Sequence, residues 1–190
     1  PADEREPRGR QAGHVRGHRL ARGFQTLGLE RHDRVAVYLP KSIEGVAALF
    51  AANAGGGAFV PVNPVLKPAQ VAHIVADCRP RVFVTSPDRW QLVQPALGEG
   101  ASALRVVLID SDADDLAAPE VSSFEDIAGD DTPFAGRGAI DADIAAILYT
   151  SGSTGRPKGV VLSHRNVAVG ADSVAQYLGI DATDRLLAVL

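Results

Sequence analysis

The chain has 190 residues and a formal charge of −4, because 23 aspartates and glutamates outnumber 19 lysines and arginines. Hydrophobic residues form 46% of it and charged residues 22%, the composition of a soluble globular protein with a packed core. The acidic balance argues against a nucleic-acid-binding protein, whose affinity depends on a basic face.

Cysteine usage and hydropathy indicate in which cellular compartment we expect the protein. Cys78 is the only cysteine, so we expect no internal disulfide, no cysteine-based zinc site and a reducing, cytoplasmic environment. The N terminus lacks the apolar core of a signal peptide. Residues 45–66 carry no charge, but glycines and prolines interrupt them, so we expect no membrane span.

The first 19 residues are polar, rich in arginine and without periodicity. We therefore expect a disordered arm over residues 1–19 and a partial domain over residues 20–190. The chain contains no methionine and stops within the apolar run DRLLAVL. This pattern leads us to expect a fragment of a longer polypeptide.

Short apolar runs alternate with amphipathic stretches along the rest of the chain. Helices are expected over residues 20–27, 43–54, 68–78, 87–93 and 164–178. Strands are expected over residues 33–40, 58–62, 81–86, 104–110, 143–150 and 159–163. The alternation predicts an α/β fold with a mostly parallel sheet flanked by helices.

Apolar spacing predicts which helix faces are buried. The helix that Ser42 caps is expected to bury one face, made of Ile43, Val46, Ala47, Phe50 and Ala54. The last helix has an apolar face made of Val167, Ala171, Val174 and Leu178. Residues 110–138 are acidic and rich in turn residues, which indicates a solvated connection. A metal site there is the less favoured alternative, because the spacing of a calcium loop is missing.

The stretch YTSGSTGRPKGVVLS, residues 149–163, contains a glycine-rich loop that joins two apolar strand-like runs at an expected sheet edge. Its glycines permit positive φ and close approach of the backbone to a ligand, and successive amide groups in such turns can bind an anion. Hydroxyl side chains and one lysine add further donors. A flexible linker fits less well between two strands. A Walker A loop fails, because Pro157 and Gly159 stand where that pattern needs glycine and a hydroxyl.

This stretch resembles the phosphate-binding loop of the AMP-forming acyl-CoA synthetases and related adenylating enzymes. The segments AGGGAFVPVNPVLKPAQVAHIVADC, DRVAVYLPKS and DIAAILYT are similar to the same family, and the resemblance covers about residues 20–190. His32 departs from it, standing where a glycine often precedes the aspartate of DRVAV. The implied fold is part of the large N-terminal domain of an adenylate-forming enzyme.

The resemblance implies that ATP and Mg²⁺ activate a small-molecule carboxylic acid to an acyl-adenylate, which then passes to coenzyme A. It assigns the ATP phosphates to seven residues: Thr150, Ser151, Gly152, Ser153, Thr154, Gly155 and Lys158. The family's catalytic lysine and its metal and acyl-pocket residues would follow residue 190. We therefore assign no catalytic residue and no metal ligand here, and expect the chain to be inactive by itself. An amino-acid-activating domain of a peptide synthetase and a catalytically dead nucleotide-binding remnant are the alternatives.

Other polar residues have simpler interpretations. His73 and Asp77 lie one turn apart and are expected to form a solvated pair. Cys78 is expected in the core rather than as a nucleophile. Tyr149 is expected to pack against the loop. His164 begins a helix, which favours a structural role over a place in an acyl pocket.

Overall fold

The computed structural model describes residues 8–111, 118, 120–129, 134, 136, 138–150 and 156–184, with side chains from residue 17 onward except Glu99. Within them a seven-stranded sheet has the order β5-β4-β3-β1-β2-β6-β7. The strands are β1 (Arg34–Tyr38), β2 (Ala58–Pro61), β3 (Val82–Thr85), β4 (Arg105–Leu108), β5 (Val121–Ser123), β6 (Ile144–Thr150) and β7 (Lys158–Ser163). All neighbouring strands run parallel except β6 and β7, which are antiparallel. The predicted mostly parallel α/β sheet is confirmed.

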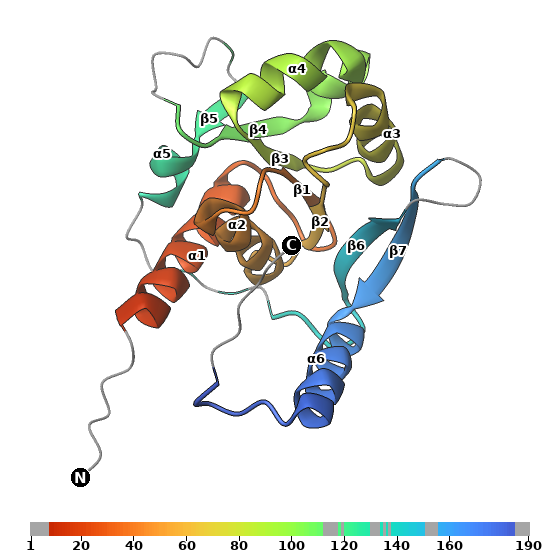
Figure 1. The fold of residues 1–190 in the computed structure, drawn as a ribbon. Coiled ribbons are helices and arrows are strands. Elements are labelled where there is room, and N and C mark those ends of the chain that lie inside the picture. The colour runs from red at the N-terminus through yellow and green to blue at the C-terminus, as the bar shows by residue number, and fades with distance from the viewer. Residues whose placement is uncertain are drawn as a thin grey trace.

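The helices α1 to α5 divide between the two faces of the sheet (Figure 1). They are α1 (Arg8–Thr26), α2 (Ile43–Ala54), α3 (Pro68–Cys78), α4 (Pro87–Leu97), α5 (Phe124–Ala128) and α6 (His164–Leu178), and a 3₁₀ helix covers Gly98–Ala103. The helices α1, α2 and α5 share one core with the sheet, and α3 and α4 share the other. Alternate strand residues supply the two cores, as the pleat requires: Val35 and Val37 belong to the first, Ala36 and Tyr38 to the second.

Helix starts follow the capping signals in the sequence. The Ser42 side chain accepts from the Gly45 amide at 3.0 Å and begins α2. Pro68 stands in the first turn of α3. Ser163 accepts from the Asn166 amide at 3.1 Å, while the Ser163 amide donates to the Asn166 side chain at 3.0 Å. This reciprocal pair fixes the start of α6 directly after β7.

The buried face of α2 matches the prediction only in part, because Ala47 is buried and Ala54 packs against the core but the large residues are not covered. Ile43, Val46 and Phe50 are exposed, with 72%, 52% and 70% of their surfaces accessible. The buried face is lined instead by small residues, which are Gly45, Ala47, Ala48, Ala51 and Ala52. Because α2 is apolar on nearly every side, its spacing could not decide which face is buried. Small side chains allow the α2 backbone to approach its core partners closely.

Helix α6 differs from expectation in a similar way. It has the expected apolar face, but none of its residues is buried against the described part of the chain. Val167, Val174 and Leu178 are 41%, 54% and 61% exposed. The periodicity therefore predicts the helix correctly without showing what covers it.

Two segments expected to be irregular contain regular structure. Helix α1 begins at Arg8, so residues 8–19, expected as a disordered arm, are helical, whereas residues 1–7 lie outside the description. The acidic connection contains β5 and α5, which bury Ser123 and Phe124. A three-residue strand and a five-residue helix are too short to give a clear periodic signal. Tertiary contacts with β4 and α1 stabilise them.

Candidate functional site

The predicted loop joins two paired strands at the edge of the sheet. Strand β6 runs parallel to β2, with Phe59 opposite Ala146, so its carboxyl end lies at the same edge as those of β1 to β4. Strand β7 returns antiparallel from that edge and is the last strand of the sheet. The carboxyl edge of an open parallel sheet is where ligands of α/β proteins commonly bind. The two predicted strands that flank the loop are thus confirmed, and they meet at this edge.

Two of the seven predicted phosphate ligands are described, and they face each other. Thr150 is the last residue of β6, Lys158 is the first of β7, and the two are partners in the ladder. Both are exposed, which leaves a hydroxyl and an ammonium group available to a ligand at the turn. Ser151, Gly152, Ser153, Thr154 and Gly155 lie outside the described residues, so their assignment stays a prediction.

Gly159 has a different role from the one expected. It lies within β7 and is not among the described residues with positive φ, so left-handed backbone does not explain it. A Cβ at this position would lie 2.8 Å from Cγ2 of Ile147 and 3.2 Å from Cζ of Tyr149. Tyr149 is the ladder partner of Gly159, and its ring lies across the space that a side chain would fill. Glycine is needed here for strand packing.

Helix α3 contacts both sides of the hairpin near its turn. The hydroxyl of Tyr149 donates to the carboxylate of Asp77. Nε2 of His73 lies 3.2 Å from the carbonyl oxygen of Pro157, and because a carbonyl only accepts, that nitrogen donates. Each contact involves the residue next to Thr150 or Lys158. Figure 1 shows α3 beside the hairpin.

These contacts correct the interpretation of His73 and Asp77 as a solvated pair. Each side chain instead bonds to a different strand of the hairpin. The Tyr149 ring packs on the core and beside Gly159 of β7, and its hydroxyl reaches α3, while its expected packing against the loop stays a prediction. Burial, followed by the hydrogen bond to the Asp77 carboxylate, raises the pKa of Tyr149, so the phenol stays protonated and can donate. The i, i+4 spacing of His73 and Asp77 was visible in the sequence, but their partners were not.

Cys78 lies beneath this region in the core. It is 7% exposed and belongs to the cluster against which Tyr149 packs. Burial raises the pKa of the thiol to about 11, so it is protonated at neutral pH. The prediction of a core residue rather than a nucleophile agrees with this environment.

The other end of the hairpin is tied to neighbouring loops. The His164 amide donates to the carbonyl oxygen of Asp143 at 3.0 Å. The Asp143 side chain accepts from the Ile140 amide at 3.0 Å and from Arg31 at 2.7 Å. The Ile140 amide, followed by the Arg31 guanidinium, lowers the pKa of the Asp143 carboxyl. These bonds give His164 a structural place at the start of α6.

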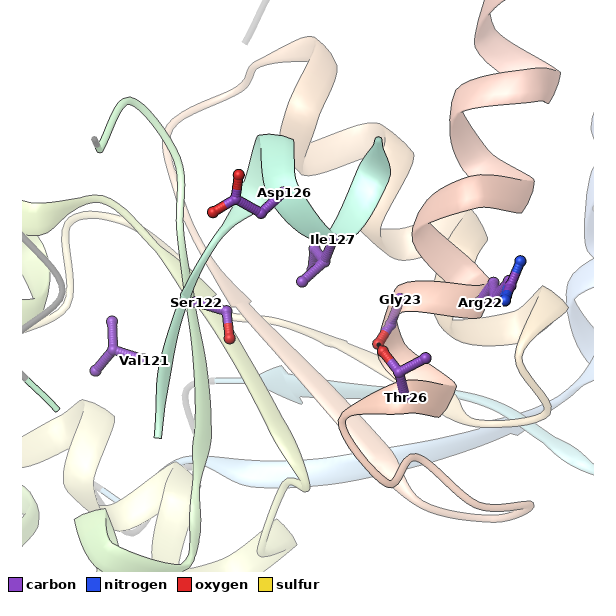
Figure 2. Close-up of a pocket in the computed structure, with 7 residues that line it drawn as sticks. All are labelled: Arg22, Gly23, Thr26, Val121, Ser122, Asp126 and Ile127. Carbon is purple, nitrogen blue, oxygen red and sulfur yellow. Dashed lines mark hydrogen bonds between the residues drawn. The ribbon is translucent and has the colours of Figure 1, made fainter. Parts of the chain in front are cut away.

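An open cavity of about 340 Å³ lies elsewhere, between α1, β5 and α5. Its lining residues are Arg22, Gly23, Thr26, Val121, Ser122, Asp126 and Ile127 (Figure 2). Strand β5 is at the opposite edge of the sheet from β7, so this cavity and the hairpin turn are separate. The cavity contains none of the predicted phosphate ligands.

The fold and the hairpin define an open α/β protein with polar donors at the carboxyl edge of its sheet. The family model for the AMP-binding enzyme matches residues 14–190. The chain therefore belongs to the AMP-binding enzyme family, whose members similar to it include acyl-CoA ligases and other adenylate-forming enzymes. Within the described residues, no helix is both long and apolar enough to cross a membrane.

The similar proteins include both a CoA ligase and a peptide synthetase. A sulfoacetate–CoA ligase from Cupriavidus necator is 33% identical over 171 residues, which are 90% of this chain and 32% of that protein. A probable non-canonical nonribosomal peptide synthetase, CymA, from Salinispora arenicola is also 33% identical, over 90% of this chain and 2% of its own length. The crystal structure of ATP-bound MatB from Rhodopseudomonas palustris has a TM-score of 0.71 at 28% identity, covering 86% of this chain and 31% of that one. The chain thus spans about a third of its CoA-ligase relative.

Proposed function

We propose that this chain forms the ATP-phosphate-binding part of an enzyme that activates a carboxylic acid as an acyl-adenylate and passes the acyl group to coenzyme A. The observation that carries the proposal is the hairpin, which places Thr150 opposite Lys158 at the carboxyl edge of the sheet. The sulfoacetate–CoA ligase supports coenzyme A as acceptor, and ATP-bound MatB supports ATP as nucleotide. We place the enzyme in the cytoplasm on the basis of its cysteine usage.

The chemical problem in adenylation is charge, because a carboxylate must approach the α-phosphorus of an anionic nucleotide. The hydroxyl of Thr150 can donate to a phosphate oxygen, and the ammonium of Lys158 can offset the charge of the leaving pyrophosphate. We propose that Ser151, Ser153 and Thr154 add hydroxyl donors, and that Gly152 and Gly155 provide backbone amides. The paired strands β6 and β7 on both sides would keep these donors aligned with the phosphate chain.

Magnesium bound to the nucleotide would offset further phosphate charge. The described residues of β6 and β7 include no carboxylate, so we assign no magnesium ligand to these strands. Thr150 and Lys158 would act on the phosphate oxygens that the metal leaves free.

An amino-acid-activating domain of a peptide synthetase is the second candidate. CymA supports it at the same identity as the CoA ligase. The two candidates share the adenylation step and differ in the acceptor, which is coenzyme A in one and a carrier-bound thiol in the other. A nucleotide-binding remnant without activity is the third candidate.

The experiment is acid-dependent exchange of pyrophosphate into ATP by the full-length gene product, with panels of carboxylic and amino acids. Lys158→Ala should slow exchange about tenfold to a hundredfold, since a charge-assisted contact contributes about 1.5–3 kcal/mol. Lys67→Ala, which removes another exposed lysine, is the control. Thioester formation with coenzyme A or with a carrier protein then separates the two acceptors. No exchange with any acid, or equal rates in wild type and Lys158→Ala, would refute the proposal.

A further inference from the structure

We infer that α3 is a positioning element of the phosphate site, acting through His73 and Asp77 on the turn end of the β6–β7 hairpin. This inference rests on the proposed function, because it concerns where Thr150 and Lys158 stand relative to ATP. Neither His73 nor Asp77 is among the predicted phosphate ligands. Both act through a neighbouring residue.

The first step is that the hairpin has little other support on its outer side. Strand β7 is the edge of the sheet, and β6 is its ladder partner. Val160 and Val161 of β7 are 45% and 54% exposed, so side-chain packing within the described residues holds this strand weakly. Strand β6 joins the sheet through Ala146, opposite Phe59 of β2, and residues 147–150 continue towards the turn paired with β7. A two-stranded extension of this kind is marginally stable without further contacts. The orientation of the turn end therefore depends on bonds beside the turn, whereas β2 and the Asp143 contacts hold the other end.

The second step is that α3 provides such bonds to both strands. Asp77 accepts from the Tyr149 hydroxyl on β6, and His73 donates to the Pro157 carbonyl just before β7. The two α3 residues are four apart and therefore lie on the same side of the helix. One rigid helix thus fixes the two chain segments that enter and leave the turn.

The third step is that the Tyr149 ring transmits this restraint across the ladder. The ring lies over Gly159, whose missing side chain leaves room for it. Tyr149 precedes Thr150, and Gly159 follows Lys158. A shift of the ring would therefore move both proposed phosphate contacts together. The same ring packs on the core cluster that contains Cys78, which anchors it from below.

The fourth step is that α3 itself is packed in the core. The residues Val71, Ile74, Val75 and Cys78 of α3 are buried against the sheet. The helix is therefore part of the core and cannot follow the hairpin if the hairpin moves. Contacts to a fixed helix restrict the hairpin, and that restriction reduces the ordering needed when ATP binds.

The test uses the full-length gene product and measures binding of ATP with Mg²⁺ by calorimetry, beside thermal melting. His73→Leu and Tyr149→Phe each remove one hydrogen bond while preserving side-chain bulk. Each should weaken ATP binding about three- to tenfold, and the double variant more, with little change in melting temperature. His73→Gln retains a side-chain N–H donor and should recover much of the loss. Tyr177→Phe on α6, where the tyrosine is 88% exposed, is the matched control and should bind as wild type does.

A second readout needs no nucleotide. Amide hydrogen exchange in the turn halves of β6 and β7 without ATP should be about tenfold faster in the double variant, because the turn end of the hairpin opens more often. Unchanged exchange in that variant would overturn the inference. Loss of the cooperative melt in both single variants would also overturn it, since the contacts would then be only structural.

The outcomes separate this inference from the proposed function. If Lys158→Ala weakens ATP binding but the double variant binds ATP as wild type does, the positioning role is wrong and the proposed function stands. If wild type does not bind ATP, or Lys158→Ala binds as well as wild type, the proposed function fails and the inference fails with it.

Discussion

Replacing Gly159 with alanine should destabilise the protein although it adds only one methyl group. The new Cβ would lie 2.8 Å from Cγ2 of Ile147 and 3.2 Å from Cζ of Tyr149. The first distance requires one of the atoms to move, and the hydrogen bond to Asp77 restrains the tyrosine. Overpacking of this kind costs about 1–3 kcal/mol. Alanine also lowers the entropy of the unfolded chain, which offsets about 0.5–1 kcal/mol.

The net expectation is a loss of about 1–2 kcal/mol, because the steric cost exceeds the entropic gain. For a protein of this size the melting temperature should fall by about 2–8 °C. The assay is calorimetric melting of wild type, Gly159→Ala and Gly170→Ala. Gly170 is the matched control, because a Cβ there meets nothing within 4 Å and alanine favours the helix that contains it. Gly170→Ala should therefore melt at or above the wild-type temperature.

A double variant tests the contact between a side chain at position 159 and Ile147. Ile147→Ala removes the nearest atom, so Gly159→Ala should cost less in that background than in wild type. The reasoning is refuted if Gly159→Ala melts with wild type, or if its cost is the same in both backgrounds.

Three further predictions concern the thiol, a turn and the core. Burial raises the pKa of Cys78 from 9.0 to about 11, so alkylation of the folded protein at pH 8 should be at least about a hundredfold slower than that of an exposed thiol. Because the pKa of the folded state is the higher one, the thiol's contribution to the free energy of unfolding should be complete below about pH 9 and lost between about pH 9 and 11. Urea titrations across this pH range should show the loss in wild type and a smaller loss in Cys78→Ala. His32 has a φ of 71°, so His32→Gly should relieve backbone strain and raise the melting temperature by about 1–4 °C. An unchanged or lower melting temperature would show that the turn is unstrained. Phe83 is fully buried between the rings of Tyr38 and Trp90. In denaturant unfolding, Phe83→Ala should therefore lower the free energy of unfolding by about 3–5 kcal/mol, and Phe50→Ala, at an exposed position, by less than about 0.5 kcal/mol. Comparable losses for the two variants would contradict the assigned core.

The His32 turn shows how the family resemblance and the structure complement each other. The sequence shows a histidine where glycine is frequent in the family, without giving a reason. The structure gives His32 a left-handed backbone, with its amide donating to the Gly56 carbonyl at 3.0 Å. Glycine adopts this conformation without strain, whereas histidine carries a steric cost.

The sequence by itself determined the class of fold and the two strands, β6 and β7, that flank the glycine-rich loop. Apolar runs of strand length alternate with amphipathic stretches, and that local signal depends on residues close together in the chain. The caps at Ser42 and Ser163 are local for the same reason, since each serine bonds to an amide three residues away. The position of the loop between two strands therefore needed no tertiary information.

The tertiary structure alone decided which faces are buried and what each polar group contacts. Helix α2 is apolar around its circumference, so only its neighbours could select the alanine face over Ile43 and Phe50. His73 is separated from Pro157 by 84 residues and Asp77 from Tyr149 by 72, so no local pattern joins them. Chain topology brings α3 against the hairpin, and burial together with hydrogen-bond geometry then fixes what these side chains do. The sequence specified the residues of the hairpin, and folding determined that Thr150 lies opposite Lys158 and that α3 contacts the residues beside them.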